Sequence, residues 1–287
     1  MISHGPRCNT ATGRKFWNKQ AYRFTRSFYG APTTNLYFEE EKRLFRRYFP
    51  DIKGRKLLKL DLWNEAQNTQ ILFWAARQGG ECYAVDIAEA TAQKARDRSL
   101  EAMVSIQIAI GDVSYLPFSN DSFDYLYTMG TLEHIPDPST AFDEIARVLK
   151  PGGVAIVGVP NIYDPFLFSI ASRILQSLGK YPYGYERWFT NRQLKCFLEN
   201  AGLRTPQQDG ILFLPWFLRF LDAYLWQKHP WGCRITSLFV KPFRLLTRIQ
   251  WLSRKCGYLT ICVAEKEILS ADLHPKMRGP AEALERV

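Results

Sequence analysis

Acidic residues end two apolar segments of the sequence and closely follow a third, and their carboxylates could bind a ligand. Asp61 ends "KLLKLD", Asp86 ends "ECYAVD", and Asp112 comes after "VSIQIAIG". If these segments are parallel strands, the three acids lie at one edge of a sheet, where open α/β sheets bind their ligands. A carboxylate at Asp86 can accept both hydroxyl groups of a ribose, and Asp112, beside the apolar Val113, can accept an adenine amino group. Each acid alone could be a solvated turn residue, but the ordered set favours a nucleotide-binding edge.

The segments around these acids alternate between strand and helix patterns, and these elements would position them. Apolar runs predict strands, and amphipathic runs between them predict helices. The alternation predicts a Rossmann-like, doubly wound, mostly parallel α/β sheet with helices on both faces. A late strand over 259–266 could close the sheet edge. The other predicted strands are 56–62, 81–87, 104–113, 123–130 and 154–160, and the predicted helices are 33–49, 68–78, 89–102, 138–150 and 191–203.

Changes in composition divide the chain into four parts. An N-terminal segment with a helix occupies 1–50, and the alternating core occupies 51–161. Residues 162–267 continue the fold and include an aromatic, basic helical cap, whereas 268–287 are expected to form a flexible tail.

Composition and charge narrow the class of protein. Hydrophobic residues make up 46% and charged residues 23%, which excludes a disordered chain. A net charge of +10 suits an anionic partner, such as a membrane surface, a phosphorylated substrate or nucleic acid, or is an inert basic surface. The six cysteines form no CxxC pair and no metal-ligand spacing with a histidine, so no metal site is predicted and reduced thiols in a cytoplasmic protein are expected. No segment resembles a signal peptide or a transmembrane helix.

The central part of the chain resembles a known enzyme family. "VDIAE" and "GDVSYLPFSNDSFDYLYTMGTLEHIPDPSTAFDEIARVLKPGGVAIVGVPN" are similar to the signature of class I S-adenosylmethionine-dependent methyltransferases, in particular the small-molecule "methyltransferase type 11" group. The resemblance covers about 56–161 closely and "YERWFTNRQLKCFLENAGLR" weakly. It implies a seven-stranded sheet, S-adenosylmethionine as cofactor and a small-molecule or lipid-like acceptor. It assigns Asp61, Asp86, Asp112 and Val113 to the cofactor site. Ile87, Thr128 and Met129 stand at the same strand ends and are also expected to bind the cofactor.

The first motif departs from this family. The family has glycines after its first acid, whereas this chain reads "DLWNEAQNT". The side chains of Asn64, Asn68 or Thr69 could bind the amino-acid end of the cofactor in place of glycine-loop amides, as could the first amides of the helix that follows. Alternatively, Trp63 fills the pocket, and the protein is a non-catalytic scaffold or a membrane-surface binding protein. A third reading is a different adenosyl ligand. A nicotinamide-dependent oxidoreductase is disfavoured because no GxGxxG follows the first strand.

Methyl transfer needs few catalytic residues, because the donor is already activated and the enzyme mainly aligns the reactants and excludes water. A general base helps a weakly nucleophilic acceptor, and His134, just beyond the fourth strand, is the candidate. Its alternative role is structural, in the "LEH" turn. Tyr183, Tyr185, Glu186 and Trp188 are expected to line the acceptor pocket, or else to form a hydrophobic lid without specific contacts.

Residues 215–256 combine basic and aromatic residues. This pattern is typical of peripheral contact with a membrane surface, here the inner face of the membrane. A cap packed on the core with a solvated basic face is the alternative. Nucleic acid is an unlikely partner because no RNA-binding module is recognisable. The sequence leaves the oligomeric state open.

Overall fold

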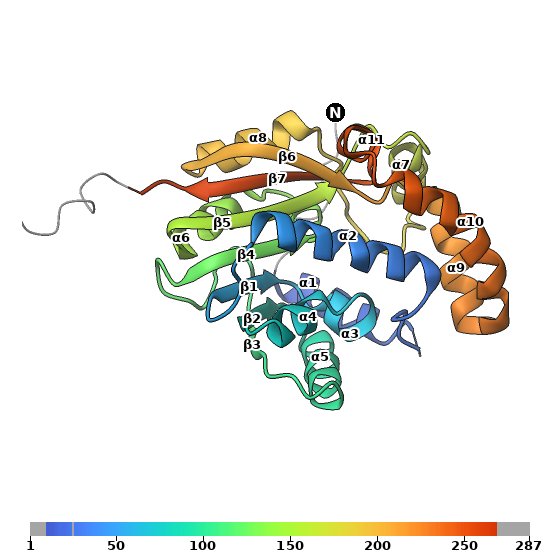
Figure 1. Ribbon diagram of the computed structural model, residues 1–287, viewed down its shortest axis with the longest axis horizontal. Helices are drawn as coiled ribbons and strands as arrows, with labels where there is room; N and C mark the ends of the chain where they lie inside the picture. The colour runs from blue at the N-terminus through green and yellow to red at the C-terminus, as the bar shows by residue number, and fades with distance from the viewer. Residues whose placement is uncertain (1–9, 25, 269–287) are drawn as a thin grey trace, which may run out of the picture.

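The computed structural model describes residues 10–24 and 26–268, and these contain one seven-stranded mixed sheet (Figure 1). The strand order is β3-β2-β1-β4-β5-β7-β6. The pairs among β1 to β5 are parallel, and β7 runs antiparallel to both β5 and β6. The Rossmann-like, mostly parallel fold class predicted from the sequence is therefore confirmed. The strands are β1 Lys56–Leu60, β2 Glu81–Asp86, β3 Gln107–Ile110, β4 Phe123–Met129, β5 Leu149–Pro160, β6 Leu203–Ile211 and β7 Leu259–Lys266.

Helices cover both faces of this sheet. Alternate side chains of β4 enter different cores, because successive strand residues point to opposite faces: Tyr127 joins an apolar cluster with Phe45 and Leu72, and Leu126 joins one with Phe142 and Leu194. The helices are α1 Thr10–Ala21, α2 Pro32–Tyr48, α3 Trp63–Gln67, α4 Ile71–Arg77, α5 Glu89–Glu101, α6 Ser139–Val148, α7 Phe168–Ser177, α8 Asn191–Asn200, α9 Trp216–Lys228, α10 Cys233–Leu246 and α11 Gln250–Cys256, with 3-10 turns at Leu132–His134 and Pro230–Gly232.

Three sequence predictions about elements need correction. The helix predicted over 68–78 begins later, as α4 at Ile71, because Gln70 lies in the left-handed region at φ 59°, and the separate helix α3 before it was not predicted. The strand over 259–266 is real but does not lie at the edge, because the unpredicted β6 pairs with its outer side. The helix α1 was also not predicted. Tertiary contacts hold it, since Asn18 Oδ1 accepts from the Ala90 amide at 2.8 Å and Lys94 Nζ donates to the Ala21 carbonyl at 2.6 Å.

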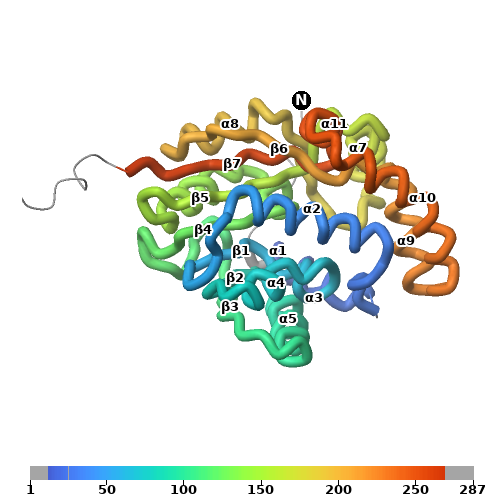
Figure 2. Tube along the Cα trace, viewed as in Figure 1, coloured from blue at the N-terminus to red at the C-terminus, as the bar shows by residue number. Residues whose placement is uncertain are grey.

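The helical cap is attached to the core through a buried acid. Asp222 of α9 accepts hydrogen bonds from the amide and hydroxyl of Thr33, at the start of α2, and from the hydroxyl of Thr236 in α10. The Cα trace shows α9 and α10 beside that end of α2 (Figure 2). Within the described ranges, no helix has the length and apolar character needed to cross a membrane. The tail predicted over 268–287 lies, except for Ile268, outside the described residues.

Candidate functional site

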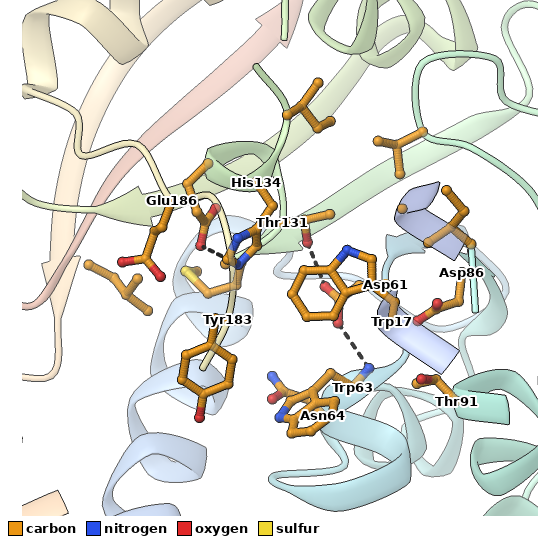
Figure 3. Close-up of a pocket in the computed structure, with 18 of the residues that line it drawn as sticks. Trp17, Asp61, Trp63, Asn64, Asp86, Thr91, Thr131, His134, Tyr183 and Glu186 are labelled. Atoms are coloured by element: carbon orange, nitrogen blue, oxygen red, sulfur yellow. Dashed lines mark hydrogen bonds and ion pairs between the residues drawn. The ribbon is translucent and has the colours of Figure 1, made fainter. Parts of the chain in front are cut away.

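A cavity of about 610 Å³ lies at the carboxyl ends of β1, β2 and β4. In Figure 3, Asp61 lies between Thr131 and Trp63, with Asp86 on one side and His134 on the other. The volume is in the range of small-molecule sites, about 300–1,000 Å³. The sequence-predicted residues that line this cavity are Asp61, Trp63, Asn64, Asn68, Asp86, Ile87, Asp112, Val113, Met129, His134 and Tyr183.

Four other predicted site residues are not among those that line the cavity. Thr69 and Thr128 are fully buried, and the Thr128 side chain points to the opposite face of β4 from its neighbour Met129, which does line the cavity. Trp188 packs edge-on against Phe168 with ring centres 5.6 Å apart, so it supports the wall from behind. The Tyr185 side chain is exposed to solvent. Periodicity could not separate these residues from true lining residues, because their orientation depends on the tertiary packing.

Asp86 is the most constrained acid of the cavity. Its Oδ2 accepts from the Leu62 amide at 2.8 Å and its Oδ1 from the Ala88 amide at 2.7 Å. These bonds tie the loop after β1 to the loop after β2. A carboxylate has about four acceptor positions, so two remain for a ligand. Burial raises the pKa of Asp86 to about 7, opposed by the two amides.

Asp112 and Val113 form the neighbouring wall. Asp112 Oδ1 accepts from the Ser114 amide at 2.8 Å, which closes a turn after β3. Both residues are partly exposed and line the cavity with Ile87. A planar ring between Ile87 and Val113 would have apolar contacts on its faces and the Asp112 carboxylate at its edge. Binding of adenine there stays a prediction.

The loop without glycines folds into a single helical turn. α3 covers "WNEAQ", and Asp61 precedes it with φ 83°, a conformation in which aspartate is one of the few tolerated side chains. Asp61 Oδ1 accepts from the Trp63 amide at 3.1 Å, and its Oδ2 accepts from the Thr131 hydroxyl at 2.8 Å. The amides of Leu62 and Trp63 therefore face Asp86 and Asp61 instead of a ligand. The sequence hypothesis of exposed first amides concerned the helix that follows, α4, where the Leu72 amide donates to Glu65 Oε1 at 3.0 Å.

Lys59 holds this turn from inside the sheet. Its ammonium group is fully buried and donates to the Asp61 carbonyl at 2.9 Å, and it lies 3.1 Å from both Asp61 Oδ1 and Glu65 Oε2. Burial alone would lower the pKa of Lys59, but Asp61, Glu65 and Glu41 together raise it, so the lysine stays protonated. Glu65 Oε1 also accepts from the Leu72 amide, at the start of α4. The sequence pattern did not indicate a role for Lys59, because a single lysine among the leucines of a predicted strand is not distinctive.

The two asparagines of the loop are part of a buried hydrogen-bond network. Asn64 Nδ2 donates to Glu41 Oε1 at 3.1 Å, and Asn68 Nδ2 donates to Asn64 Oδ1 at 3.0 Å. Thr34 donates to Asn68, and Tyr127 donates to the same oxygen of Glu41 at 2.7 Å. These side chains line the cavity, but their amide groups also hold α3 against α2. A direct contact with a cofactor stays a prediction for both.

His134 faces the cavity as a neutral imidazole. Its Nδ1 lies 2.7 Å from the Tyr185 carbonyl oxygen, which only accepts, so Nδ1 carries the proton and Nε2 has the free lone pair. Burial lowers the pKa of His134 to about 4, opposed by this hydrogen bond. Nε2 is 3.9 Å from Glu133 Oε1. A neutral histidine with a free Nε2 has the protonation state that a general base requires.

A second part of the cavity is aromatic and contains two buried acids. Glu133 and Glu186 are more than nine-tenths buried, and one oxygen of each, Glu133 Oε2 and Glu186 Oε1, has no hydrogen-bond partner among the described residues. Tyr181 donates to the other oxygen of Glu186 at 2.6 Å. Burial raises the pKa of Glu186 to about 7. Burial together with the charge of Glu186 raises the pKa of Glu133 well above its ordinary value. The surrounding walls are Phe168, Tyr181, Tyr183, Trp216, Phe220 and Tyr258.

Several lining residues come from segments far from the core motifs. Trp17 of α1 packs edge-on against His134 with ring centres 4.8 Å apart. Phe168 of α7 and Trp216 of α9 stack at 5.4 Å. Glu186, predicted for the acceptor pocket, also lines the cavity. Of the lining residues that sequence reasoning did not assign, several lie inside the recognised motifs, namely Ser114, Tyr115, Gly130, Thr131, Glu133 and Ile135, whereas Trp17, Phe168 and Trp216 lie in none. In the part of the chain that the structure describes, no group of three or more His, Cys, Asp or Glu side chains could hold a metal ion.

Comparison with known proteins gives a consistent result. Residues 67–157 match the family model described as "Methyltransferase domain". The chain is 33% identical over 146 residues to a ubiquinone biosynthesis O-methyltransferase of Xanthomonas euvesicatoria, covering 49% of this chain and 61% of the relative, and 30% identical to the protein of the same name from Xylella fastidiosa, covering 49% and 59%. The chain thus spans about three fifths of the length of these curated relatives.

Solved structures share the fold at low identity. An S-adenosylmethionine-dependent methyltransferase from Mesorhizobium loti has a TM-score of 0.56 at 16% identity, covering 79% of this chain and 97% of that one. The [4+2]-cyclase SpnF has the same TM-score at 20% identity, covering 80% and 81%. At these identities the likeness concerns the fold alone. Taken with the family-model match over 67–157 and the motifs, it makes the chain similar to class I S-adenosylmethionine-dependent methyltransferases, apart from its glycine-free first motif.

Proposed function

We propose that the protein is an S-adenosylmethionine-dependent methyltransferase that acts on a small-molecule or lipid-like acceptor. The observation that carries this proposal is the single cavity that joins the strand-end acids Asp61, Asp86 and Asp112 to an aromatic chamber. The acids lie where the family binds its cofactor, and the chamber is where a second, apolar reactant would fit. Since the fold also occurs in a protein titled a [4+2]-cyclase, the fold alone does not fix the reaction.

The residues present fit the adenosine end of the cofactor. Asp86 has two free acceptor positions for the ribose hydroxyls, and Ile87 and Val113 would enclose the adenine beside Asp112. When bound, the cofactor supplies a methyl group activated by a positively charged sulfur. The chain's own contribution is to orient the two reactants and to exclude water.

Proton transfer on the acceptor side would use His134. Its Nε2 can accept the proton of a hydroxyl group, because Nδ1 carries the proton of the neutral ring. This arrangement favours an acceptor oxygen, which is consistent with the relatives named O-methyltransferases. Aromatic walls favour an acceptor with a planar or apolar body.

Calorimetry with S-adenosylmethionine, S-adenosylhomocysteine and NAD tests the proposal. We expect both adenosyl ligands to bind and NAD not to bind. Absence of adenosyl binding at millimolar ligand would refute the proposal and favour a non-catalytic scaffold. Binding of NAD alone would indicate an oxidoreductase.

We also propose that the cap contacts a membrane surface. Exposed large apolar side chains recur at helical spacing on α9, namely Phe217, Phe220, Leu221 and Tyr224, and on α10, namely Ile235, Leu238, Phe239 and Leu245. Monomeric soluble proteins rarely expose contiguous apolar surfaces of this kind. The two helices pack against each other, so their exposed stripes would lie in the plane of a bilayer.

Charge on these helices suits an anionic bilayer. The exposed basic residues of the cap are Lys228, Arg234, Lys241, Arg244, Arg248, Arg254 and Lys255, and each is worth about 1 kcal/mol near an anionic surface. Phe220 is exposed and also lines the cavity. A lipid-like acceptor could therefore pass from the bilayer to the aromatic chamber beside α9.

Sedimentation with lipid vesicles tests this contact. We expect binding to vesicles that contain anionic lipid and weaker binding to neutral vesicles. The double variant Leu238→Ser/Phe239→Ser should lose binding, whereas a change at the exposed Leu100 of α5, Leu100→Ser, should not. Equal binding by parent and double variant would contradict the proposal.

A further inference from the structure

Arg219 is a cation in the cavity with no anionic partner among the residues that the structure describes. It comes from α9, is partly exposed, and is the only lysine or arginine among the described residues that line the cavity. Its guanidinium carbon lies 5.2 Å from the centre of the Tyr37 ring. Burial raises the pKa of Tyr37, Tyr183 and Tyr258, and the positive charge of Arg219 offsets part of each rise. None of the ion pairs between described residues includes Arg219.

Two backbone amides after β1 that could hold an anion are already engaged. The amides of Leu62 and Trp63 donate to Asp86 and Asp61. The helix that follows has only five residues, so its dipole offers little to an anion. The side-chain amide of Asn64, in α3, donates to Glu41, and that of Asn68, at the end of α3, donates to Asn64. Together with the two aspartates, this makes the end of the cavity near β1 poor in free donors and negative in charge.

We infer that Arg219 binds a carboxylate, that of the methionine end of the cofactor, in place of a glycine-rich loop. The inference rests on the proposed function. Tyr37, against which Arg219 lies, borders the same part of the cavity as Asn64 and Asn68. A guanidinium can donate two parallel hydrogen bonds to a carboxylate, and Asp61 would face the ammonium group of the same ligand. The cap, outside the matched region 67–157, would then complete the cofactor site.

Two adenosyl ligands distinguish binding of the cofactor carboxylate by Arg219 from a structural role of this residue. S-Adenosylhomocysteine carries the amino-acid end, whereas 5′-methylthioadenosine lacks it. In calorimetry, we expect Arg219→Met to weaken S-adenosylhomocysteine binding by about tenfold or more, the range for a lost charged hydrogen bond, and to leave 5′-methylthioadenosine binding unchanged. Arg219→Lys should retain part of the affinity, because a lysine keeps the charge but not the bidentate geometry. The control Arg192→Met removes an exposed arginine from α8 and should change neither affinity.

The other outcomes overturn the inference in distinguishable ways. If Arg219→Met binds both ligands as the parent does, Arg219 does not contact the cofactor, and a carboxylate on the acceptor becomes the alternative source. If both affinities fall together with the melting temperature, the effect of Arg219 is structural. If the parent binds neither ligand, the proposed function itself fails, and this inference fails with it.

Discussion

At the scale of single residues, Asp86 combines a structural role with a proposed binding role. Its two oxygens accept hydrogen bonds from the amides of Leu62 and Ala88, and these bonds fix the two loops that border the cavity. The acid was recognisable because it ends an apolar strand, but its bonds to both loops were not. Its raised pKa, about 7, follows from burial, and ligand hydroxyls would favour its ionised form.

Replacing Asp86 with Asn should weaken adenosyl binding. The change removes the charge that assists hydrogen bonds from ribose hydroxyls, and we expect the affinity for 5′-methylthioadenosine to fall by about tenfold or more. In the parent, affinity should also fall as the pH drops below about 7, because Asp86 then becomes protonated. Calorimetry from pH 6 to 8.5 measures both effects. The exposed Asp143→Asn, on α6, is the matched control, and an unchanged affinity in Asp86→Asn would place the ribose elsewhere.

At the scale of elements, α3 replaces a glycine loop with a helical turn held by buried charges. Glycine loops allow close backbone approach because they lack side chains. Here Asp61 adopts the left-handed conformation, and Lys59 binds both its carbonyl and its carboxylate. Glu65 links the same lysine to the first turn of α4. The turn is therefore specified by polar side chains, each of which has a partner in the interior.

Replacing Lys59 with Met should destabilise the fold strongly. The variant leaves Asp61 and the fully buried Glu65 without their cation, and breaking a buried ion pair costs about 3–5 kcal/mol. Urea denaturation measures the change in the free energy of unfolding. Lys56→Met, an exposed position on the same strand, should change it by less than about 0.5 kcal/mol. Similar losses in both variants would contradict a special role for Lys59.

At the scale of the whole molecule, buried carboxyl groups make stability depend on pH. Burial raises the pKa of Glu40 and Glu186 to about 7 and that of Glu41 to about 8. In the unfolded chain such groups titrate near 4.3. The folded protein therefore binds these protons more tightly, so the stabilisation is complete below the unfolded pKa and is lost as the pH rises through 7 to 8.

We expect the free energy of unfolding to be higher at pH 6 than at pH 8.5, by an amount on the order of a few kcal/mol. Glu41→Gln should reduce this dependence, because it removes the carboxyl group with the highest of these three pKa values. Glu81→Gln, at an exposed position of β2, should leave the dependence as in the parent. Chemical denaturation at several pH values tests this, and a stability that increases from pH 6 to 8.5 would contradict it.

The sequence by itself determined the elements whose signals are local. Strand-helix alternation predicted β1 to β5 and the helices between them, because burial on both faces of a parallel sheet requires continuous apolar strands. The acids Asp61, Asp86 and Asp112 could be assigned to one edge because the carboxyl ends of parallel strands meet there. β6, "LRTPQQDGI", gave no such signal, since an edge strand has polar residues and a proline.

Only the tertiary structure decided how the cavity is completed. Trp17, Phe168 and Arg219 come from elements distant in sequence, and packing alone brings them to the edge that carries Asp61. The structure also decided that Asn64 and Asn68 hold α3 against α2, because Glu41 and Thr34, their partners, lie on a helix before the core. A local pattern records which face of an element is apolar, but it does not record which other element that face meets.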